Sequence, residues 1–330
     1  MKKVFVKGPM LTRSGYGEHA RFLMRALRKY EGKLFDIYAD PTGWGNTGWE
    51  VEDTEERKWL DGVVEKSQRY KAEKGKFDIS LQVTIPNEWE NYADTNIGVT
   101  AGIETTMVAP QWLEKSWNMD KIITISQHSK TVYEKTTYDA TNNETGEKFV
   151  ARCTTPIDIV HYPVRGKKTA DLNIEFSTKF NFLAVAQWGP RKALDETVLW
   201  FLEEFKDNPD VGLVLKASKI NNSYQDRQGV REHLKNLHAS VPDCQCKIHL
   251  IHGNMKEEEI HALYVHPQIK AIVSLTHGEG FGLPLFEAAY SGLPVVAPEW
   301  SGHLDFLCMP VKDKKGKIKN RPMFATVDYN

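Results

Sequence analysis

The sequence lacks an excess of charge of either sign. Its 330 residues include 43 lysines and arginines against 44 aspartates and glutamates, which gives a formal net charge of −1. A balanced chain has no overall attraction for nucleic acid or for an anionic membrane, although a local basic patch is compatible with that balance. The composition therefore does not indicate a general polyanion-binding protein.

Cysteine and long apolar runs are also scarce. The four cysteines, at positions 153, 244, 246 and 308, include no Cys-x-x-Cys pair, so we interpret them as reduced thiols rather than zinc ligands or disulfides. The first residues contain no apolar core of about 7–15 residues, as a secretory signal would require. No stretch approaches the roughly 18 apolar residues of a membrane span. We therefore expect a cytoplasmic protein.

The chain is long enough for about two domains, at roughly 150 residues per domain. Along it, apolar segments with the pattern of a strand alternate with segments that have the pattern of a helix. Strand–helix alternation predicts parallel sheets covered on both faces, an α/β fold. In the first half we expect strands at Val4–Val6, Leu34–Tyr38, Phe77–Val83, Ile97–Ala101 and Lys121–Ser126, with helices at Glu18–Tyr30 and Glu52–Lys74. In the second half we expect strands at Phe182–Ala186, Val211–Leu215, Ile248–Ile251, Ala271–Leu275 and Pro294–Ala297, with helices at Glu196–Phe205, Arg231–Leu237, Glu257–Tyr264 and Pro284–Ser291.

The apolar rhythm lapses between Val164 and Phe176, where the segment 165–168 is basic and polar. We therefore expect two Rossmann-like domains, 1–165 and 178–330, joined by a linker at 166–177. Ligands of open α/β sheets bind at the carboxyl ends of the strands, so a cleft between two such domains is the expected site.

The most informative segment reads THGEGFGLPLFEAA, from Thr276 to Ala289, directly after an apolar strand. Gly280 and Gly282 allow a tight turn and a close approach to a ligand, and Pro284 suits the start of a helix. The amides of Gly280–Leu283 would then face outward at a helix N-terminus, which favours phosphates.

Two glutamates frame this segment, Glu279 before the helix and Glu287 within it, with seven residues between them. The string EGFGLPLFEAAYSGLPVVA resembles the Glu-x7-Glu signature of retaining GT-B glycosyltransferases, in particular glycosyltransferase family 4. The resemblance implies that Glu279 and the amides of Gly280, Phe281 and Gly282 hold the donor sugar, and the Leu283 amide completes the expected anion site. It implies that Glu287 binds the ribose of a nucleotide sugar, while His277 beside Glu279 is a further candidate donor contact.

The segment VAQWGPRK, from Val185 to Lys192, resembles the family's strand followed by a basic step. By that resemblance Lys192 and Arg191 meet the donor diphosphate. The family often carries an arginine shortly before this step, where this chain has Gln187. Lys216, at the end of the next expected strand, is a second candidate phosphate ligand, with a solvated lysine as the alternative.

Gly15-Tyr16-Gly17 resembles the N-terminal glycine loop with which the family closes over the donor. The same residues also spell the dinucleotide pattern GxGxxA, with Ala20 as its last position. We reject that interpretation because seven residues, 8–14, separate the first glycine of the pattern from the strand, and they predict a long flexible loop instead.

Glu104-Thr105, followed by Pro110 and Trp112, resembles one branch of the same superfamily. Many members have a donor-binding histidine after the preceding strand, and this chain has none there. Either Glu104 takes that place or the sugar contact differs. Family members usually end in a helix that crosses back to the first domain. The charged segment 312–321 does not resemble that helix, so we expect either a truncated version or a shortened family member.

The resemblance implies a retaining transferase that moves a sugar from a UDP-, GDP- or ADP-sugar to an unidentified acceptor, a glycan, lipid, protein or modified nucleic acid base. No Asp-x-Asp pair occurs, so we expect no metal and no cofactor beyond the donor. Two alternatives remain: a non-catalytic GT-B module that binds a nucleotide sugar, and a glycosyltransferase of modified nucleic acid bases. A basic groove would favour the second.

Overall fold

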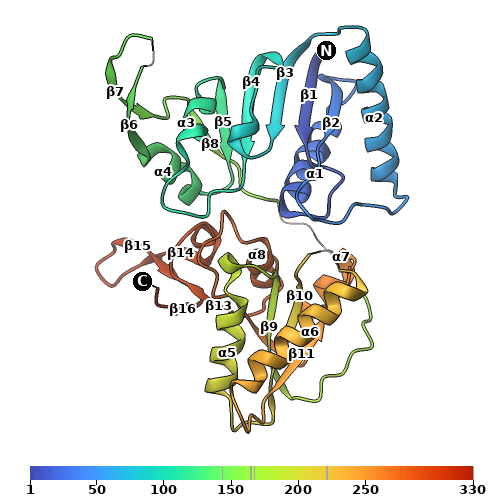
Figure 1. The fold of residues 1–330 in the computed structure, drawn as a ribbon, viewed down its shortest axis with the longest axis vertical. Coiled ribbons are helices and arrows are strands. Elements are labelled where there is room, and N and C mark those ends of the chain that lie inside the picture. The colour runs from blue at the N-terminus through green and yellow to red at the C-terminus, as the bar shows by residue number, and fades with distance from the viewer. Residues whose placement is uncertain (143, 164–165, 167, 221, 330) are drawn as a thin grey trace. The chain divides into compact units, whose positions relative to one another are not determined.

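A computed structural model describes residues 1–142, 144–163, 166, 168–220 and 222–329. The chain divides into two compact units, with the boundary between Pro163 and Val164 (Figure 1). Each unit is built on its own six-stranded sheet, in which every pair of neighbouring strands is parallel. The α/β fold class predicted from the strand–helix alternation is thereby confirmed.

The first unit has the strand order β2-β1-β3-β4-β5-β8. Apolar residues on both faces of its strands explain why the sheet is covered on both sides: in β1, Val4 and Val6 pack against Met24 of the first helix, while Phe5 points the other way and stacks on Phe77 at 4.7 Å. The strands are β1 (Lys2–Gly8), β2 (Phe35–Pro41), β3 (Phe77–Val83), β4 (Ala93–Thr100), β5 (Lys121–Thr124) and β8 (Ile157–Ile159).

The helices of this unit are α1 (Gly15–Arg28), α2 (Glu55–Ala72), α3 (Pro110–Ser116) and α4 (Gln127–Lys135), with a 3₁₀ turn at Pro86–Glu88. A separate hairpin, β6 (Thr137–Thr141) and β7 (Lys148–Arg152), stands outside the sheet. Side chains begin three of the helices: Ser14, Thr54 and Ser126 each accept a hydrogen bond from a backbone N–H of the first turn.

The second unit has the order β11-β10-β9-β12-β13-β16. Successive residues of β9 again serve opposite faces, since Leu183 packs in the core with Leu285 and Ala184 packs in another with Phe201. The strands are β9 (Phe180–Gln187), β10 (Val211–Ser218), β11 (Lys247–Ile251), β12 (Ile269–Val273), β13 (Val295–Pro298) and β16 (Ala325–Val327). The helices are α5 (Leu194–Glu204), α6 (Tyr224–Ala239), α7 (Glu257–Tyr264), α8 (Leu283–Tyr290) and α9 (Leu304–Leu307), with a 3₁₀ turn at Pro190–Lys192.

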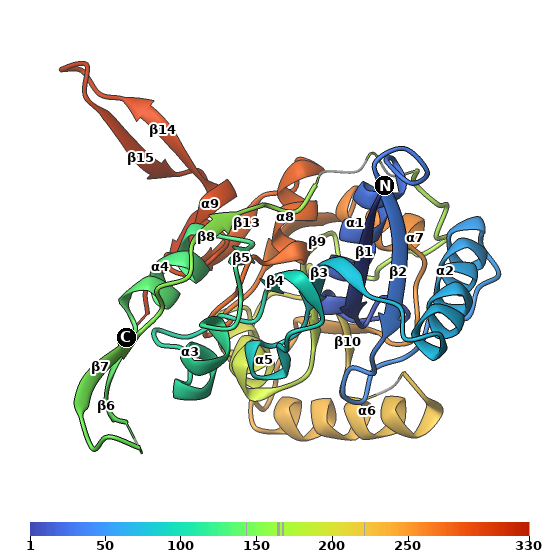
Figure 2. The same cartoon turned by 90° about the horizontal axis from the view of Figure 1, so that it is seen from above.

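Three segments differ from the sequence expectations or extend them. Gly15, Tyr16 and Gly17 lie in the first turn of α1 rather than in a flexible loop, because Ser14 caps the helix ahead of them. The charged segment at 312–321 lies in an antiparallel hairpin, β14 (Cys308–Lys312) and β15 (Ile318–Pro322), which projects from the second unit (Figure 2). Pro284 is the second residue of α8 rather than its first.

Residues around the expected linker belong to the second unit where they are described. Phe176 is buried in its core, and the Ala170 N–H donates to the Glu258 carbonyl at 3.2 Å. The basic residues Arg165 and Lys167 lie outside the described residues. Among the helices of the described part of the chain, none combines the length and the apolar character needed to cross a bilayer.

Candidate active site

The strand order of the second unit reverses at β9: β10 and β11 lie on one side of it, and β12 and β13 on the other. Ligands of open α/β sheets bind outside the carboxyl ends of the strands at such a switch point. The chain leaves β9 at Gln187 and β12 at Val273. The motif residues Arg191 and Lys192 follow the first of these ends, and Glu279 follows the second.

The two motifs meet at this switch point. The ammonium of Lys192 forms an ion pair with Glu279 Oε1, and Arg191 Nη1 lies 3.4 Å from Glu279 Oε2. Arg191 Nη1 also donates to the Gly278 carbonyl at 2.8 Å, and the His277 N–H donates to the Arg191 carbonyl at 2.8 Å. Residues almost ninety positions apart in the sequence therefore form one hydrogen-bonded cluster.

Glu279 is 7% exposed, and its charge depends on its neighbours. Burial by itself raises a carboxyl pKa, because it disfavours the charged form. The positive charges of Lys192 and Arg191 outweigh burial, and the pKa of Glu279 lies below its ordinary value. At neutral pH the site therefore holds a buried carboxylate beneath two partly exposed cations.

The turn after β13 holds the backbone of Glu279 in place, a contact that the sequence did not lead us to expect. Ser301 Oγ accepts the Glu279 N–H at 3.0 Å, and the Gly302 N–H donates to the Glu279 carbonyl at 2.8 Å. A Cβ on Gly302 would lie 1.9 Å from the Gly280 carbonyl oxygen, so only glycine permits this approach. The polar Ser-Gly-His string, which begins three residues after the end of the buried strand β13, was the available signal.

His303 completes that support. It is fully buried, and its Nε2 lies 2.7 Å from the Pro298 carbonyl oxygen, which can only accept, so Nε2 carries the proton. Burial lowers the pKa of His303, since it disfavours the charged ring. A neutral His303 therefore holds the turn without adding a third positive charge beside Glu279.

The glycine segment leads into α8 as its composition predicts. Gly282 has φ +90° and is the N-cap of α8, a backbone conformation that favours glycine. Phe281 is 3% exposed, and its ring packs against those of Phe286 and Phe306 at centroid distances of 5.2 and 5.0 Å. The Phe281 side chain therefore anchors the segment, while the helix start at Leu283 supplies the backbone polarity that favours an anion.

Three other candidates of this unit lie around that cluster. Glu287, half-buried on α8, accepts a hydrogen bond from the Tyr264 hydroxyl of α7 at 3.4 Å. Lys216, in β10, donates to the Gly253 carbonyl at 2.7 Å, and burial lowers its pKa. His277 has an exposed side chain. The structure thus joins Glu279 directly to Arg191 and Lys192, while Glu287 and Lys216 have other partners.

In the first unit, Tyr16 is buried and supports the segment that leads to Glu104. Its hydroxyl lies 2.9 Å from Thr100 Oγ1 and accepts the Ala101 N–H at 3.1 Å, and its ring stacks on Trp44 at 4.0 Å. Burial raises the pKa of Tyr16 to about 12, so the phenol stays protonated. Glu104 is half-buried. The Tyr16 hydroxyl therefore acts on the protein backbone here.

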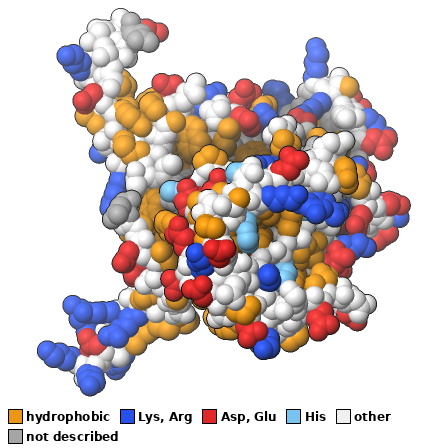
Figure 3. Space-filling view, turned by 60° about the horizontal axis from the view of Figure 1, so that its bottom comes forward, with side chains coloured by type: hydrophobic (Ala, Val, Ile, Leu, Met, Phe, Trp, Pro, Cys, Tyr) orange, Lys and Arg blue, Asp and Glu red, His pale blue; other side chains and the backbone are white. Residues whose placement is uncertain are grey.

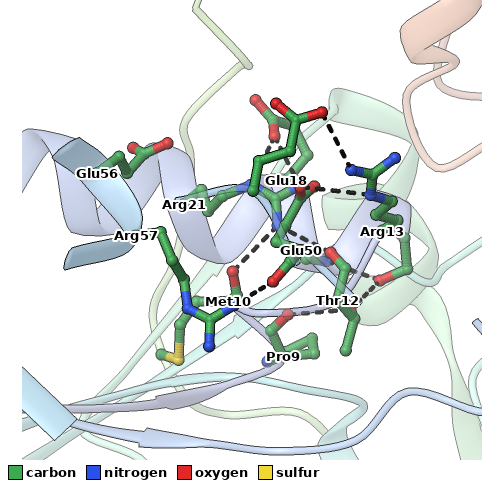
Figure 4. Close-up of polar contacts among 12 residues, drawn as sticks. Pro9, Met10, Thr12, Arg13, Glu18, Arg21, Glu50, Glu56 and Arg57 are labelled. Carbon is green, nitrogen blue, oxygen red and sulfur yellow. Dashed lines mark hydrogen bonds and ion pairs between the residues drawn. The ribbon is translucent and has the colours of Figure 1, made fainter. Parts of the chain in front are cut away.

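The loop before α1 is ordered by a buried arginine that the sequence analysis did not single out. Arg21 is 7% exposed, and its Nη1 donates to the carbonyls of Met10 and Thr12 at 3.0 and 2.8 Å (Figure 4). Glu18 lies 2.9 Å and Glu50 3.6 Å from Arg21 Nη2. The loop is tied to α1 by these contacts, which corrects the expectation of a flexible segment at 8–14.

No family model matches the chain. The sucrose-phosphate synthase of Thermosynechococcus elongatus has a similar structure, with a TM-score of 0.62 over 94% of this chain and 84% of that chain, at 14% identity. The chain has the GT-B fold. An OtsA structure gives a TM-score of 0.58 over 93% of this chain and 86% of that chain, at 10% identity. The α,α-trehalose-phosphate synthase of Burkholderia xenovorans gives 0.52 over 93% and 87%, at 12% identity.

One sequence relative adds to this GT-B likeness. The serotype-specific mannosyltransferase WbdA of Escherichia coli is 29% identical over 116 residues, which are 35% of this chain and 13% of WbdA. The match therefore spans only a small part of that longer protein, and the mannosyltransferase activity is a property of WbdA as a whole.

Proposed function

We propose that this GT-B chain is a glycosyltransferase that moves a sugar from a nucleotide-sugar donor to an acceptor hydroxyl, with retention at the anomeric carbon and without a metal. The cluster of Glu279, Lys192 and Arg191 at the switch point of the second unit carries the proposal. The similarity to sucrose-phosphate synthase and to a segment of a mannosyltransferase supports it. The cytoplasmic setting stays a prediction from the sequence.

The reaction breaks the bond between the anomeric carbon and a diphosphate oxygen and forms a bond from that carbon to the acceptor oxygen. The acceptor proton passes to the departing phosphate oxygen, so no further acid or base is required. Negative charge grows on the diphosphate as its bond breaks, and a cation facing that oxygen is worth more in the transition state than in the ground state. Lys192 and Arg191, with the backbone at the start of α8, would supply this stabilisation in place of a metal.

Glu279 has two tasks in this scheme. Its carboxylate holds the Lys192 ammonium at the carboxyl ends of β9 and β12, and the same carboxylate orients hydroxyls of the donor sugar. Its lowered pKa supports both, because an ionised carboxylate accepts hydrogen bonds and attracts cations. We assign Glu287 to the ribose of the donor, Lys216 to the donor phosphates as a second candidate, and His277 to the donor sugar.

The candidates of the first unit are assigned from the resemblance and from their contacts. Glu104 takes the place of the histidine that many family members carry. Tyr16 positions the backbone at Ala101 that leads to Glu104, since its hydroxyl is engaged there. Gly17 allows the first turn of α1 to approach the preceding loop, because a Cβ there would lie 2.1 Å from the Thr12 carbonyl oxygen. A Cβ on Gly15 would meet nothing within 4 Å, so we assign Gly15 to the donor on the resemblance alone.

A donor screen tests the proposal. Thermal unfolding is followed with UDP-, GDP- and ADP-sugars, and a matched donor at 100 times its dissociation constant adds about 2.7 kcal/mol to the free energy of unfolding. The stabilising donor is then incubated with the protein and candidate acceptors. Transfer or slow hydrolysis supports the enzyme, whereas binding without either favours the non-catalytic module. No stabilisation by any of the three classes would overturn both.

A further inference from the structure

The β14–β15 hairpin, residues 308–323, carries the strongest local charge imbalance that we find in the chain. It contains six cations, Lys312, Lys314, Lys315, Lys317, Lys319 and Arg321, against the single acid Asp313, in a protein with a net charge of −1. All six cationic side chains are exposed, and Lys and Arg gather on the projection at the lower left of Figure 3. We call this hairpin the basic arm.

The arm is built to present this charge. Its one acid is used internally: Asp313 Oδ1 accepts the N–H groups of Lys315 and Lys317 at 2.9 and 3.0 Å and so closes the turn. Gly316, at φ +80°, supplies the left-handed residue that the turn requires. Among the described residues, none of the six cations lies within 4.0 Å of a carboxylate oxygen.

The register places the charges along the length of the ribbon. Met309 pairs with Arg321, Val311 with Lys319, and Lys312 with Ile318, so three of the five steps of the ladder carry a cation. Because side chains alternate between the two faces of a strand, these cations lie on both faces of the ribbon. Five residues per strand extend roughly 17 Å at about 3.4 Å each. A B-DNA duplex presents about ten phosphate charges over that distance. A two-stranded ribbon also has a width that the major groove admits.

We propose that the basic arm docks on duplex DNA through its phosphates, without reading sequence. The turn itself, residues 313–317, has no apolar side chain to insert into a bilayer. Met309 and Ile318 are exposed on the strands, but they pair with Arg321 and Lys312, so the arm has no separate apolar face of the kind that membrane-surface elements bury. Lysine outnumbers arginine five to one in the arm, which suits point contacts with phosphates more than bidentate contacts with guanine. This inference goes beyond the transferase proposal and does not depend on it.

The test measures DNA binding by the whole chain. Fluorescence anisotropy follows a labelled duplex of about 30 base pairs between about 50 and 200 mM salt, for the wild type and for the triple variant K314Q/K315Q/K317Q. We expect the variant to bind more weakly by about tenfold or more at low salt, with a slope of log K against log salt shallower by about 2.7, because each neutralised phosphate contributes about 0.9.

A matched control removes the same charge elsewhere. The variant K235Q/K247Q/K270Q changes three exposed lysines of α6, β11 and β12 in the same unit, and we expect it to bind DNA like the wild type. Unfolding temperatures of both variants check the fold, and the single variant K315Q, with a slope change of about 0.9, serves if the triple variant is unstable. Equal losses in both triple variants, or no binding by the wild type at low salt, would overturn the proposal. Binding to phosphatidylserine vesicles is measured with the same variants. If the triple variant K314Q/K315Q/K317Q loses vesicle binding but keeps DNA binding, the arm docks on a membrane instead.

Discussion

Glu279 and Lys192 form an ion pair across the switch point of the second sheet, joining the segment after β12 to the segment after β9. Among the residues that the structure describes, neither forms an ion pair with a neighbour in the sequence. The pair depends on strand order, because β9 and β12 are adjacent although β10 and β11 lie between them in the chain.

Replacing Lys192 with alanine tests the assigned charge stabilisation. We expect Lys192→Ala to lower kcat by about 10²-fold or more, as the loss of one donor that stabilises transition-state charge commonly does. Steady-state kinetics on the donor found by the screen would measure it. Arg191 contacts the same carboxylate, so the double variant with Arg191→Ala should lose more. Near-normal kcat in both would move the diphosphate elsewhere, and Lys216 would be the first residue to test.

Glu287 is expected to act in binding rather than in chemistry. Ribose hydroxyls are unchanged in the transition state, so Glu287→Ala should raise the donor KM and leave kcat nearly unchanged. Tyr264→Phe is the matched control, since it removes only the hydroxyl that lies 3.4 Å from Glu287, and its effect on KM should be smaller. An unchanged KM with a large fall in kcat would contradict the assigned role.

Metal independence gives a third prediction. With Lys192, Arg191 and the start of α8 as the counter-charge for the diphosphate, activity should persist in EDTA. The measurement is the initial rate before and after chelation, with manganese and magnesium added back. Loss in EDTA and recovery with manganese would show that the cations do not suffice.

Two glycines in one helical turn provide a test of local packing. A Cβ on Gly17 would lie 2.1 Å from the Thr12 carbonyl oxygen, whereas nothing lies within 4 Å of a Cβ on Gly15. We expect Gly17→Ala to destabilise the protein by about 1–3 kcal/mol, the usual cost of overpacking. Gly15→Ala should be neutral or stabilising by up to about 1 kcal/mol, because alanine loses less backbone entropy in a helix. Urea denaturation distinguishes them, and similar effects of both would argue against the packing of the loop.

His19 makes the stability of the first unit depend on pH. The ring is buried, and burial lowers its pKa from 6.5 to about 3. Between these two pH values the folded protein keeps the ring neutral, while the unfolded chain protonates it. Its contribution is present above pH 6.5 and is lost as the pH falls toward 3, by roughly 1.4 kcal/mol per pH unit. His19→Phe should flatten this part of the curve.

The comparison is made as the difference in unfolding free energy between His19→Phe and the wild type from pH 7 to pH 4. Glu279 and His303, whose pKa values are also lowered, titrate in both proteins and cancel in that difference. A constant difference over this range would show that His19 is accessible to protons in the folded state.

Hydrophobic patterning was enough to predict most of the buried elements. β3 runs from Phe77 to Val83 and α7 from Glu257 to Tyr264, as their apolar patterns indicate. The exposed hairpins were not predicted, because β15 has no buried face and thus no alternation to reveal it. The start of α1 was placed too late, because its glycines suggested a loop and the cap at Ser14 went unnoticed.

The sequence by itself determined the α/β class, the glycine turn into α8, and the types of residue at the candidate site, because each depends on neighbours within one turn or one strand. Only the tertiary structure decided that Lys192 lies on Glu279, that Ser301 and Gly302 hold its backbone, and that Tyr16 supports the strand end before Glu104. These contacts join positions tens of residues apart, and they exist because parallel strands bring the loops after them to one edge of a sheet. The order of the strands, which local patterns do not encode, selects which loops meet.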